Sequence, residues 1–190
     1  MHVWIDMKVE QIQTPRDAVD VEDLAQQHHD EFGTSREFDR NAVGRACFQC
    51  CQDKARKYLN CWVAYDDDGK PVGYIAGTIR NSFYSNRDYA VQEMWFVVPR
   101  ARGTRASIEL LLQFERWAVL HRVERIYMQV EHDNDDNLVR RILQLMSRLG
   151  YKTQGYIAVK VPTYNSNKDT NNDRSTHRTV GAGERQTASQ

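Results

Sequence analysis

The arrangement of apolar and polar residues predicts strands and helices over the first 161 residues, followed by a polar tail. A period of two residues is typical of a half-buried strand, and a period near 3.6 is typical of a helix packed on one side. The predicted strands span residues 3–12, 61–65, 71–79, 89–98, 125–130 and 156–161. The predicted helices run from just after Pro15 to about residue 32, from about 37 to 58, from 107 to about 120 and from 137 to 150.

Two connections indicate how these strands pair. Residues 66–70 separate two apolar runs, and the Asp68-Gly69 pair supplies the positive φ of a tight reversal, which predicts an antiparallel hairpin. The helix from residue 107 joins the strand 89–98 to the strand 125–130, and a unit of this kind predicts a parallel crossover. The sequence therefore predicts an α/β (α+β) fold that contains both kinds of strand pairing.

Apolar residues recur on one side of the predicted helices, and we expect these sides to pack on the sheet. In the first helix they are Val19, Val21, Leu24 and Ala25. In the helix from residue 107 they are Ile108, Leu111, Leu112, Trp117 and Leu120.

The second helix carries a cluster of cysteines. Cys47, Cys50 and Cys51 stand at i, i+3 and i+4, which predicts a buried apolar side of the helix. Zinc would need a second pair of ligands at a suitable spacing, and the sequence offers none. His28 and His29 end the first helical pattern and are interpreted as surface or capping residues. We expect no metal.

Composition limits the kinds of partner. The 26 basic residues balance the 26 acidic ones, so no overall field attracts nucleic acid or an anionic membrane. The sequence has no apolar run of about 18 residues and no signal-peptide pattern, which makes the cytoplasm the expected location. We expect one domain over residues 1–162, and a polar tail over 163–190 that does not fold.

The stretch FVVPRARGTRAS, residues 96–107, passes from a strand through a basic turn into a helix. The first N–H groups of a helix lack partners within it, and the helix dipole is positive there, so such a turn can bind a phosphate. Arg102 can add charge-assisted hydrogen bonds, and Gly103 permits a close backbone approach. Thr104 and Ser107 add hydroxyl groups. The alternative is an ordinary strand-to-helix turn with surface arginines.

The order of elements resembles that of the GNAT (Gcn5-related N-acetyltransferase) superfamily. VVPRARGTRAS is similar to the family's acyl-coenzyme A loop, and SRLGYK (residues 147–152) is similar to the end of its last helix. The resemblance implies a mixed, mostly antiparallel sheet with a splayed parallel strand pair, flanked by about four helices. It also implies acetyl-CoA as the acyl donor.

The loop departs from the family pattern Q/R-x-x-G-x-G/A at two positions. Arg105 replaces the first Gly of that pattern, and Ser107 replaces the final Gly or Ala. A Cβ at Arg105 is compatible with phosphate binding if φ there is helical, because the side chain then tilts away from the N–H. The resemblance implies a donor-binding set of Arg102, Gly103, Thr104, Arg105, Ala106 and Ser107.

The resemblance also indicates which residues bind the pantetheine arm of the donor. In the family, the central strand pairs with the pantetheine like an added strand, which here places Phe96, Val97 and Val98 in the donor site. Asn137, at the start of the last helix, could bond the same arm or simply cap the helix.

For catalysis, a carboxylate base must make the amine neutral before it attacks the thioester. Glu93 stands where several family members carry a catalytic glutamate, and apolar neighbours would desolvate it and strengthen it as a base if it faces the cleft. A strand-edge glutamate paired with an arginine is the alternative. Many members have a tyrosine acid where this chain has Met146, and Tyr127, Tyr151 and Tyr156 are the candidate substitutes.

Our leading hypothesis is an N-acetyltransferase that moves acetyl from acetyl-CoA to a primary amine by direct attack in a ternary complex. The amine belongs to a small molecule or a protein, and a homodimer is possible. The runner-up is a GNAT fold without turnover that serves as a binding or structural component, for example of a phage particle. Nucleic-acid binding through Arg100, Arg102 and Arg105 is the third alternative, and one diphosphate explains these arginines better than a duplex.

Overall fold

The computed structural model describes residues 7–32, 37–52, 55–130 and 136–153. The chain separates into two compact units, Met1–Lys152 and Thr153–Gln190, and the account below concerns the first. The predicted strand 156–161 and the polar tail lie outside the described residues.

The core of the first unit is a five-stranded sheet in the order β1-β2-β3-β4-β5. Neighbours pair antiparallel from β1 to β4, and β4 pairs with β5 in parallel. The strands are β1 Lys8–Gln11, β2 Leu59–Tyr65, β3 Pro71–Asn81, β4 Asp88–Val97 and β5 Arg125–Tyr127. The mixed, mostly antiparallel sheet and the parallel crossover are confirmed.

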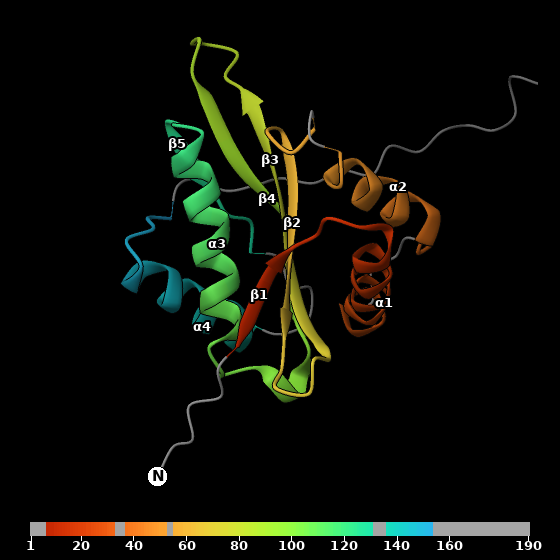
Figure 1. Cartoon of the computed structure of the whole chain (residues 1–190). Helices are drawn as coiled ribbons and strands as arrows, with labels where there is room; N and C mark the ends of the chain where they lie inside the picture. Colours follow the sequence, from red (N-terminus) through yellow and green to blue (C-terminus); the bar gives the residue numbers. More distant parts are fainter. Residues whose placement is uncertain (1–6, 33–36, 53–54, 131–135, 154–190) are drawn as a thin grey trace, which may run out of the picture. The chain divides into compact units, whose positions relative to one another are not determined.

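Helices cover both faces of this sheet. Figure 1 shows α1 and α2 on one side and α3 on the other. The helices are α1 Pro15–Phe32, α2 Arg40–Cys50, α3 Ala106–Leu120 and α4 Asp136–Arg148, with a short 3₁₀ helix η1 at Pro99–Ala101. Because it is covered on both faces, β2 is buried over Asn60–Ala64, which explains its continuous apolar run.

The close packing of α3 on β3 depends on Gly77. A Cβ at this position would lie 2.2 Å from Cε2 of Phe114, a fully buried ring of α3. Gly77 therefore lets the helix approach the sheet, and it identifies the α3 face of β3. The predicted contact through Leu120 is wrong, since this residue ends the helix and is 76% exposed.

The buried side of α1 differs from the prediction at one position. Val21, Leu24 and Ala25 are buried as expected, but Val19 is 48% exposed and Ala18 is buried in its place. Ala18 follows the 3.6-residue period back from Val21 and Ala25, whereas Val19 falls on the opposite side of the helix.

The second helix is shorter than predicted, because it ends at Cys50 and residues 55–58 form turns. The guanidinium of Arg56 donates to the carbonyls of Cys50 and Cys51 at 3.3 Å, which satisfies the end of the helix. As predicted, Cys47 and Cys50 are buried, and burial raises the pKa of each thiol to about 12. Cys51, also predicted on the buried side, is only half-buried.

The last helix ends as the sequence predicts. Gly150 follows it with φ 92°, and the N–H of Tyr151 donates to the carbonyl of Met146 at 3.0 Å, which closes the helix with a left-handed cap. The described residues contain no helix long and apolar enough to cross a membrane. Within the same residues, no group of three or more His, Cys, Asp or Glu side chains is arranged to hold a metal ion.

Candidate functional site

The turn between β4 and α3 has the backbone that a phosphate site requires. Gly103 has φ 82°, a left-handed conformation that favours glycine. Arg105 has φ −70° and ψ −14°, so its conformation is helical, as the prediction for a Cβ at this position required. The turn lies beside the β2–β3 hairpin at the lower end of Figure 1, where Arg100 pairs with Asp66 at 2.8 Å.

Four backbone N–H groups of this turn have no partner among the described residues: those of Gly103, Arg105, Ser107 and Ile108. The hydroxyl of Thr104 accepts from the N–H of Ala106 at 3.3 Å and donates to the carbonyl of Ala101 at 2.7 Å, so it holds the turn together. Four open N–H donors at the positive end of a helix can bind phosphate oxygens, and these four groups are called the phosphate seat below.

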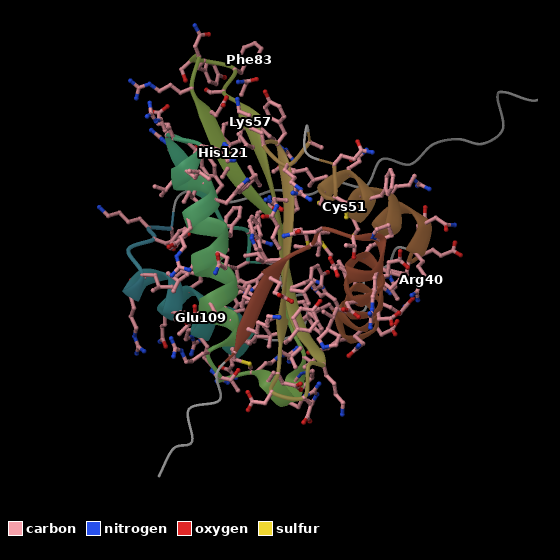
Figure 2. The ribbon with its side chains drawn as sticks, in the orientation of Figure 1. Arg40, Cys51, Lys57, Phe83, Glu109 and His121 are labelled. Carbon is pink, nitrogen blue, oxygen red and sulfur yellow. The ribbon has the colours of Figure 1, made fainter. Side chains whose placement is uncertain are left out.

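The three arginines of the turn are paired with carboxylates. In addition to Arg100, Arg105 pairs with Glu109 at 2.7 Å one turn along α3, at the start of the helix in Figure 2. Arg102 pairs with Glu31 at 2.6 Å, and its Nε donates to the carbonyl of Val97 at 3.0 Å. Its guanidinium lies 5.8 Å from the ring of Phe96. A diphosphate in the seat would therefore compete with Glu31 for Arg102.

Among the described residues, no strand pairs with the edge of β4 next to this turn. Pairing with β5 covers only three residues and ends at Val91 and Tyr127, so the two strands separate towards the loop. The side chain of Gln92 spans the separation by accepting from the N–H of Gln129 at 3.1 Å. The carbonyl of Val97 points away from β3, because its partner is the Arg102 side chain. An extended ligand can thus pair with this edge.

Phe96 lies in β4, and Val98 directly follows the last residue of this strand. The side chains of both are buried. The N–H of Val98 donates to Val72 of β3 at 2.9 Å, so its backbone faces the sheet. Phe96 faces α1, where the ring of His28 stacks on it at 4.9 Å with an interplanar angle of 12°. Asn137 is the second residue of α4, and its side chain is exposed.

Glu93 occupies a β-bulge. Ala76 pairs with Met94 and Gly77 pairs with Gln92, which leaves Glu93 as the extra residue of β4. Its Oε1 accepts from Thr78 and from Arg80, both at 2.5 Å, while Oε2 has no partner among the described residues. The side chain is 34% exposed. The ion pair with an arginine corresponds to the alternative interpretation of Glu93, and it leaves one oxygen open.

The candidate acids differ in position. Met146 is 4% exposed and has no ionisable proton. Tyr127 is 42% exposed, with its ring 5.5 Å from that of Tyr89. The hydroxyl of Tyr151 is buried near the carboxylate of Glu115, and burial raises the pKa of Tyr151. Tyr156 lies outside the described residues.

Two features of the site were not predicted from the sequence. Glu31 reaches Arg102 from 71 residues away, and no local pattern marks this pair. His28 is not a surface residue: its Nδ1 lies 3.1 Å from the hydroxyl of the buried Tyr74, and burial, with the nearby charge of Arg102, lowers its pKa to about 4. The buried Leu24 and Ala25, four and three residues earlier, are local signals that His28 faces the core.

Two surface hollows lie elsewhere on the described residues. One, of about 380 Å³, lies along α3 between Leu112 and Leu120, and one of the same volume lies between β1 and Tyr65. Neither includes the β4–α3 turn. The candidate site is therefore defined by open backbone donors and an open strand edge.

The chain was compared with known proteins. A search of curated protein sequences finds none that matches. Among solved structures, it is similar to the aminoglycoside N-acetyltransferase AAC(6')-Iy in complex with CoA, with a TM-score of 0.65 and 14% identity over 85% of this chain and 98% of that one. An aminoglycoside acetyltransferase from an uncultured soil metagenomic sample has a TM-score of 0.64 and 17% identity, over 84% and 100%.

A third similar structure is the ribosomal-protein-alanine N-acetyltransferase from Brucella melitensis biovar Abortus 2308, with a TM-score of 0.60 and 11% identity over 83% of this chain and 99% of that one. At these identities the similarity establishes the fold. The model of the acetyltransferase (GNAT) family matches residues 18–151, which include every helix and strand from α2 to α4. The chain belongs to the acetyltransferase (GNAT) family.

Proposed function

We propose that this protein is an N-acetyltransferase that transfers the acetyl group of acetyl-CoA to a primary amine by direct attack in a ternary complex. The observation that carries the proposal is the combination of four open N–H donors at the start of α3 with the unpaired edge of β4 beside them. Acetyl-CoA supplies a thioester, whose carbonyl carbon is open to attack by a neutral amine.

The backbone of the turn would hold the diphosphate of the donor. The N–H groups of Gly103, Arg105, Ser107 and Ile108 supply the hydrogen bonds, and Arg102 adds charge after it leaves Glu31. Within the predicted stretch Phe96, Val97 and Val98, the outward-facing backbone of Val97 would align the pantetheine arm, and Asn137 is a further candidate to bond it. This arrangement directs the thioester along β4 towards the bulge at Glu93.

Glu93 is our candidate base. Thr78 and Arg80 fix Oε1, so Oε2 is free to take a proton from the bound ammonium, directly or through water. The neutral nitrogen then forms the new C–N bond, the C–S bond breaks, and the second proton of the nitrogen passes to the departing thiolate. Tyr127 or water would carry this last proton, since Met146 has none to give.

The acceptor is a primary amine, and aminoglycosides are one class to test because two of the similar structures are aminoglycoside acetyltransferases. A second function, a GNAT fold that binds without turnover, is favoured by one observation: a buried Met146 occupies the position of the tyrosine acid in many members of the family.

Two measurements test the proposal. Acetyl-CoA at a hundred times its dissociation constant should stabilise the fold by about 2.7 kcal/mol in a thermal shift assay. Thiol release with a panel of amines should then reveal turnover. Glu93→Gln should lower turnover about a hundredfold or more without changing the affinity for acetyl-CoA. Glu124→Gln, at the residue before β5, is the matched control and should retain full turnover.

Three results would count against this function. Absence of a thermal shift would exclude the donor site. A shift without turnover on any amine would favour the binding protein. Equal turnover in wild type and Glu93→Gln would remove Glu93 as the base.

A further inference from the structure

The face of the sheet opposite α3 carries the side chains around Glu93. Gly77 lies against Phe114 of α3, and successive residues of a strand point to opposite faces, whereas residues two apart share a face. Thr78 therefore faces away from α3, and Arg80 shares its face. Their contacts with Glu93 confirm that all three side chains meet on this face.

The neighbouring strands extend this face into a row. Arg80 pairs with Tyr89 of β4, and Tyr89 pairs with Arg125 of β5. Paired residues of adjacent strands share a face, so two arginines flank one tyrosine. Tyr127 lies beside the row, in edge-to-face contact with Tyr89 at an angle of 89°. The row lies towards the end of the sheet that carries the β3–β4 hairpin, marked by Phe83 in Figure 2.

The acidic residues next to this row in the sequence point to the other face. Asp88 precedes Tyr89, and Glu124 precedes Arg125, so alternation directs their side chains away from the row. The hydrogen bond between Asn81 and Asp88 agrees with this, because these residues are the next pair along the same two strands. The row itself is therefore basic.

The two arginines are available to a ligand. The side chain of Arg80 is 53% exposed, and its carboxylate partner is Glu93 alone among the described residues. Arg125 is exposed and has no carboxylate partner within the part of the chain that the structure describes. Glu93 therefore balances the charge of Arg80, and the charge of Arg125 is left unbalanced on this face beside the candidate base.

We propose that the acceptor carries an anionic group, a carboxylate or a phosphate, in addition to its amine, and that Arg80 and Arg125 bind this group across Tyr89. The proposal rests on the proposed function, because it takes Glu93 as the end of the site that receives the amine. Strands lie about 4.8 Å apart, so the two arginines stand about 10 Å apart at Cα, and their long side chains can converge over the ring between them. Guanidinium groups match the planar oxygens of both anions.

Arg125 is then a specificity-determining residue, and its charge opposes polycationic acceptors. An acceptor with a second ammonium group would place that charge against Arg125 instead of against a carboxylate. The charge of Arg125 therefore favours an anionic acceptor over an aminoglycoside, although this chain shares its fold with aminoglycoside acetyltransferases.

Matched amines test the inference. Thiol release is measured with ethanolamine against O-phosphoethanolamine, with propylamine against 4-aminobutanoate, and with 1,3-diaminopropane and an aminoglycoside as cations. We expect kcat/KM to be roughly tenfold higher or more for each anionic member, the effect of about one charge-assisted hydrogen bond. Arg125→Gln should remove this preference mainly through KM, and Arg125→Lys should keep part of it. Arg116→Gln, an equal charge change at an exposed position of α3, should leave the preference intact.

Calorimetry of the same amines with the CoA complex separates the two proposals. Binding of the anionic amines that depends on Arg125, without turnover, would support the acceptor class and overturn the enzyme. Turnover with equal or higher kcat/KM for the neutral and cationic amines would overturn the acceptor class and leave the enzyme in place. The preference for phosphate or for carboxylate identifies which anion the site takes. No binding of either anion would also overturn the inference.

Discussion

Replacing Gly103 by alanine tests whether the backbone of the β4–α3 turn binds the donor. Gly103 has φ 82°, and no atom outside its chain neighbours lies within 4 Å of where a Cβ would stand. The methyl group of alanine therefore meets no other atom, and the substitution lowers stability only through the unfavourable backbone conformation at residue 103. A non-glycine residue in the left-handed region costs about 1–2 kcal/mol, which for a chain of this size lowers Tm by roughly 2–8 °C.

The protein contains two matched controls. Gly69, in the β2–β3 hairpin, has φ 72°, and Gly150, after α4, has φ 92°. The Cβ position is open at both. Alanine at either glycine should therefore cause a similar loss of stability by urea unfolding, while the β4–α3 turn remains as it is.

Donor affinity should separate Gly103→Ala from these controls. If φ at this residue relaxes to a negative value, the peptide groups on either side of it rotate, and the open N–H groups of the turn change direction. Loss of one or two hydrogen bonds to a charged group, at about 1.5–3 kcal/mol each, weakens binding by at least roughly tenfold. Titration calorimetry with acetyl-CoA measures this directly.

We expect alanine at Gly103, Gly69 or Gly150 to lower stability by similar amounts, and only Gly103→Ala to lower the affinity for acetyl-CoA. Equal acetyl-CoA affinities in all three variants would refute the assignment of the donor site to this backbone. Unchanged stability in Gly103→Ala, with losses in both controls, would show that the turn adopts another conformation at no cost. Gly103→Glu, which adds bulk and negative charge to the seat, should abolish binding.

Two further substitutions address the surroundings of the turn. Glu31→Gln should tighten acetyl-CoA binding by about two- to tenfold in calorimetry, because Arg102 loses the carboxylate that competes with the diphosphate; weaker binding would show that the ion pair acts by positioning the turn. His28→Phe should reduce the pH dependence of stability. The folded pKa of about 4 lies below the unfolded value of about 6.5, so unfolding takes up a proton as the pH falls between these values, and wild type should lose roughly 3 kcal/mol over this window. Urea unfolding at pH 7.5 and 4.5 measures the difference, and an equal pH dependence in both proteins would contradict a buried neutral His28.

The order of the strands and helices could be predicted because each leaves a local signal. The hairpin at Gly69, the end of α4 at Gly150 and the helical φ of Arg105 all follow from turn chemistry and spacing within a few residues. The extent of α2 could not be predicted in this way. Its end depends on Arg56, whose carbonyl accepts from the indole of Trp117 at 3.1 Å, a contact between residues 61 apart.

The same limit applies to the candidate site. The motif marks Gly103 and Arg102, but it does not indicate that Glu31 pairs with Arg102. The bulge at Glu93 depends on the register in which β3 and β4 pair. The sequence of one strand, taken alone, does not specify that register. Arg80 and Arg125 form one row only because three strands pair in a specific order, so this face could be recognised only in the folded protein.

The replacements at Arg105 in the loop and at Met146 in the last helix have different physical consequences. Arg105 adopts the helical conformation that any L-residue tolerates, and its side chain pairs with Glu109 along α3, so its N–H remains open. This position has no conformational need for glycine, whereas Gly103 has one. Met146, in contrast, removes a proton donor, and no backbone geometry replaces it. Donor binding and turnover should therefore be separable in this protein: the loop favours the first, and the second depends on how the thiolate obtains its proton.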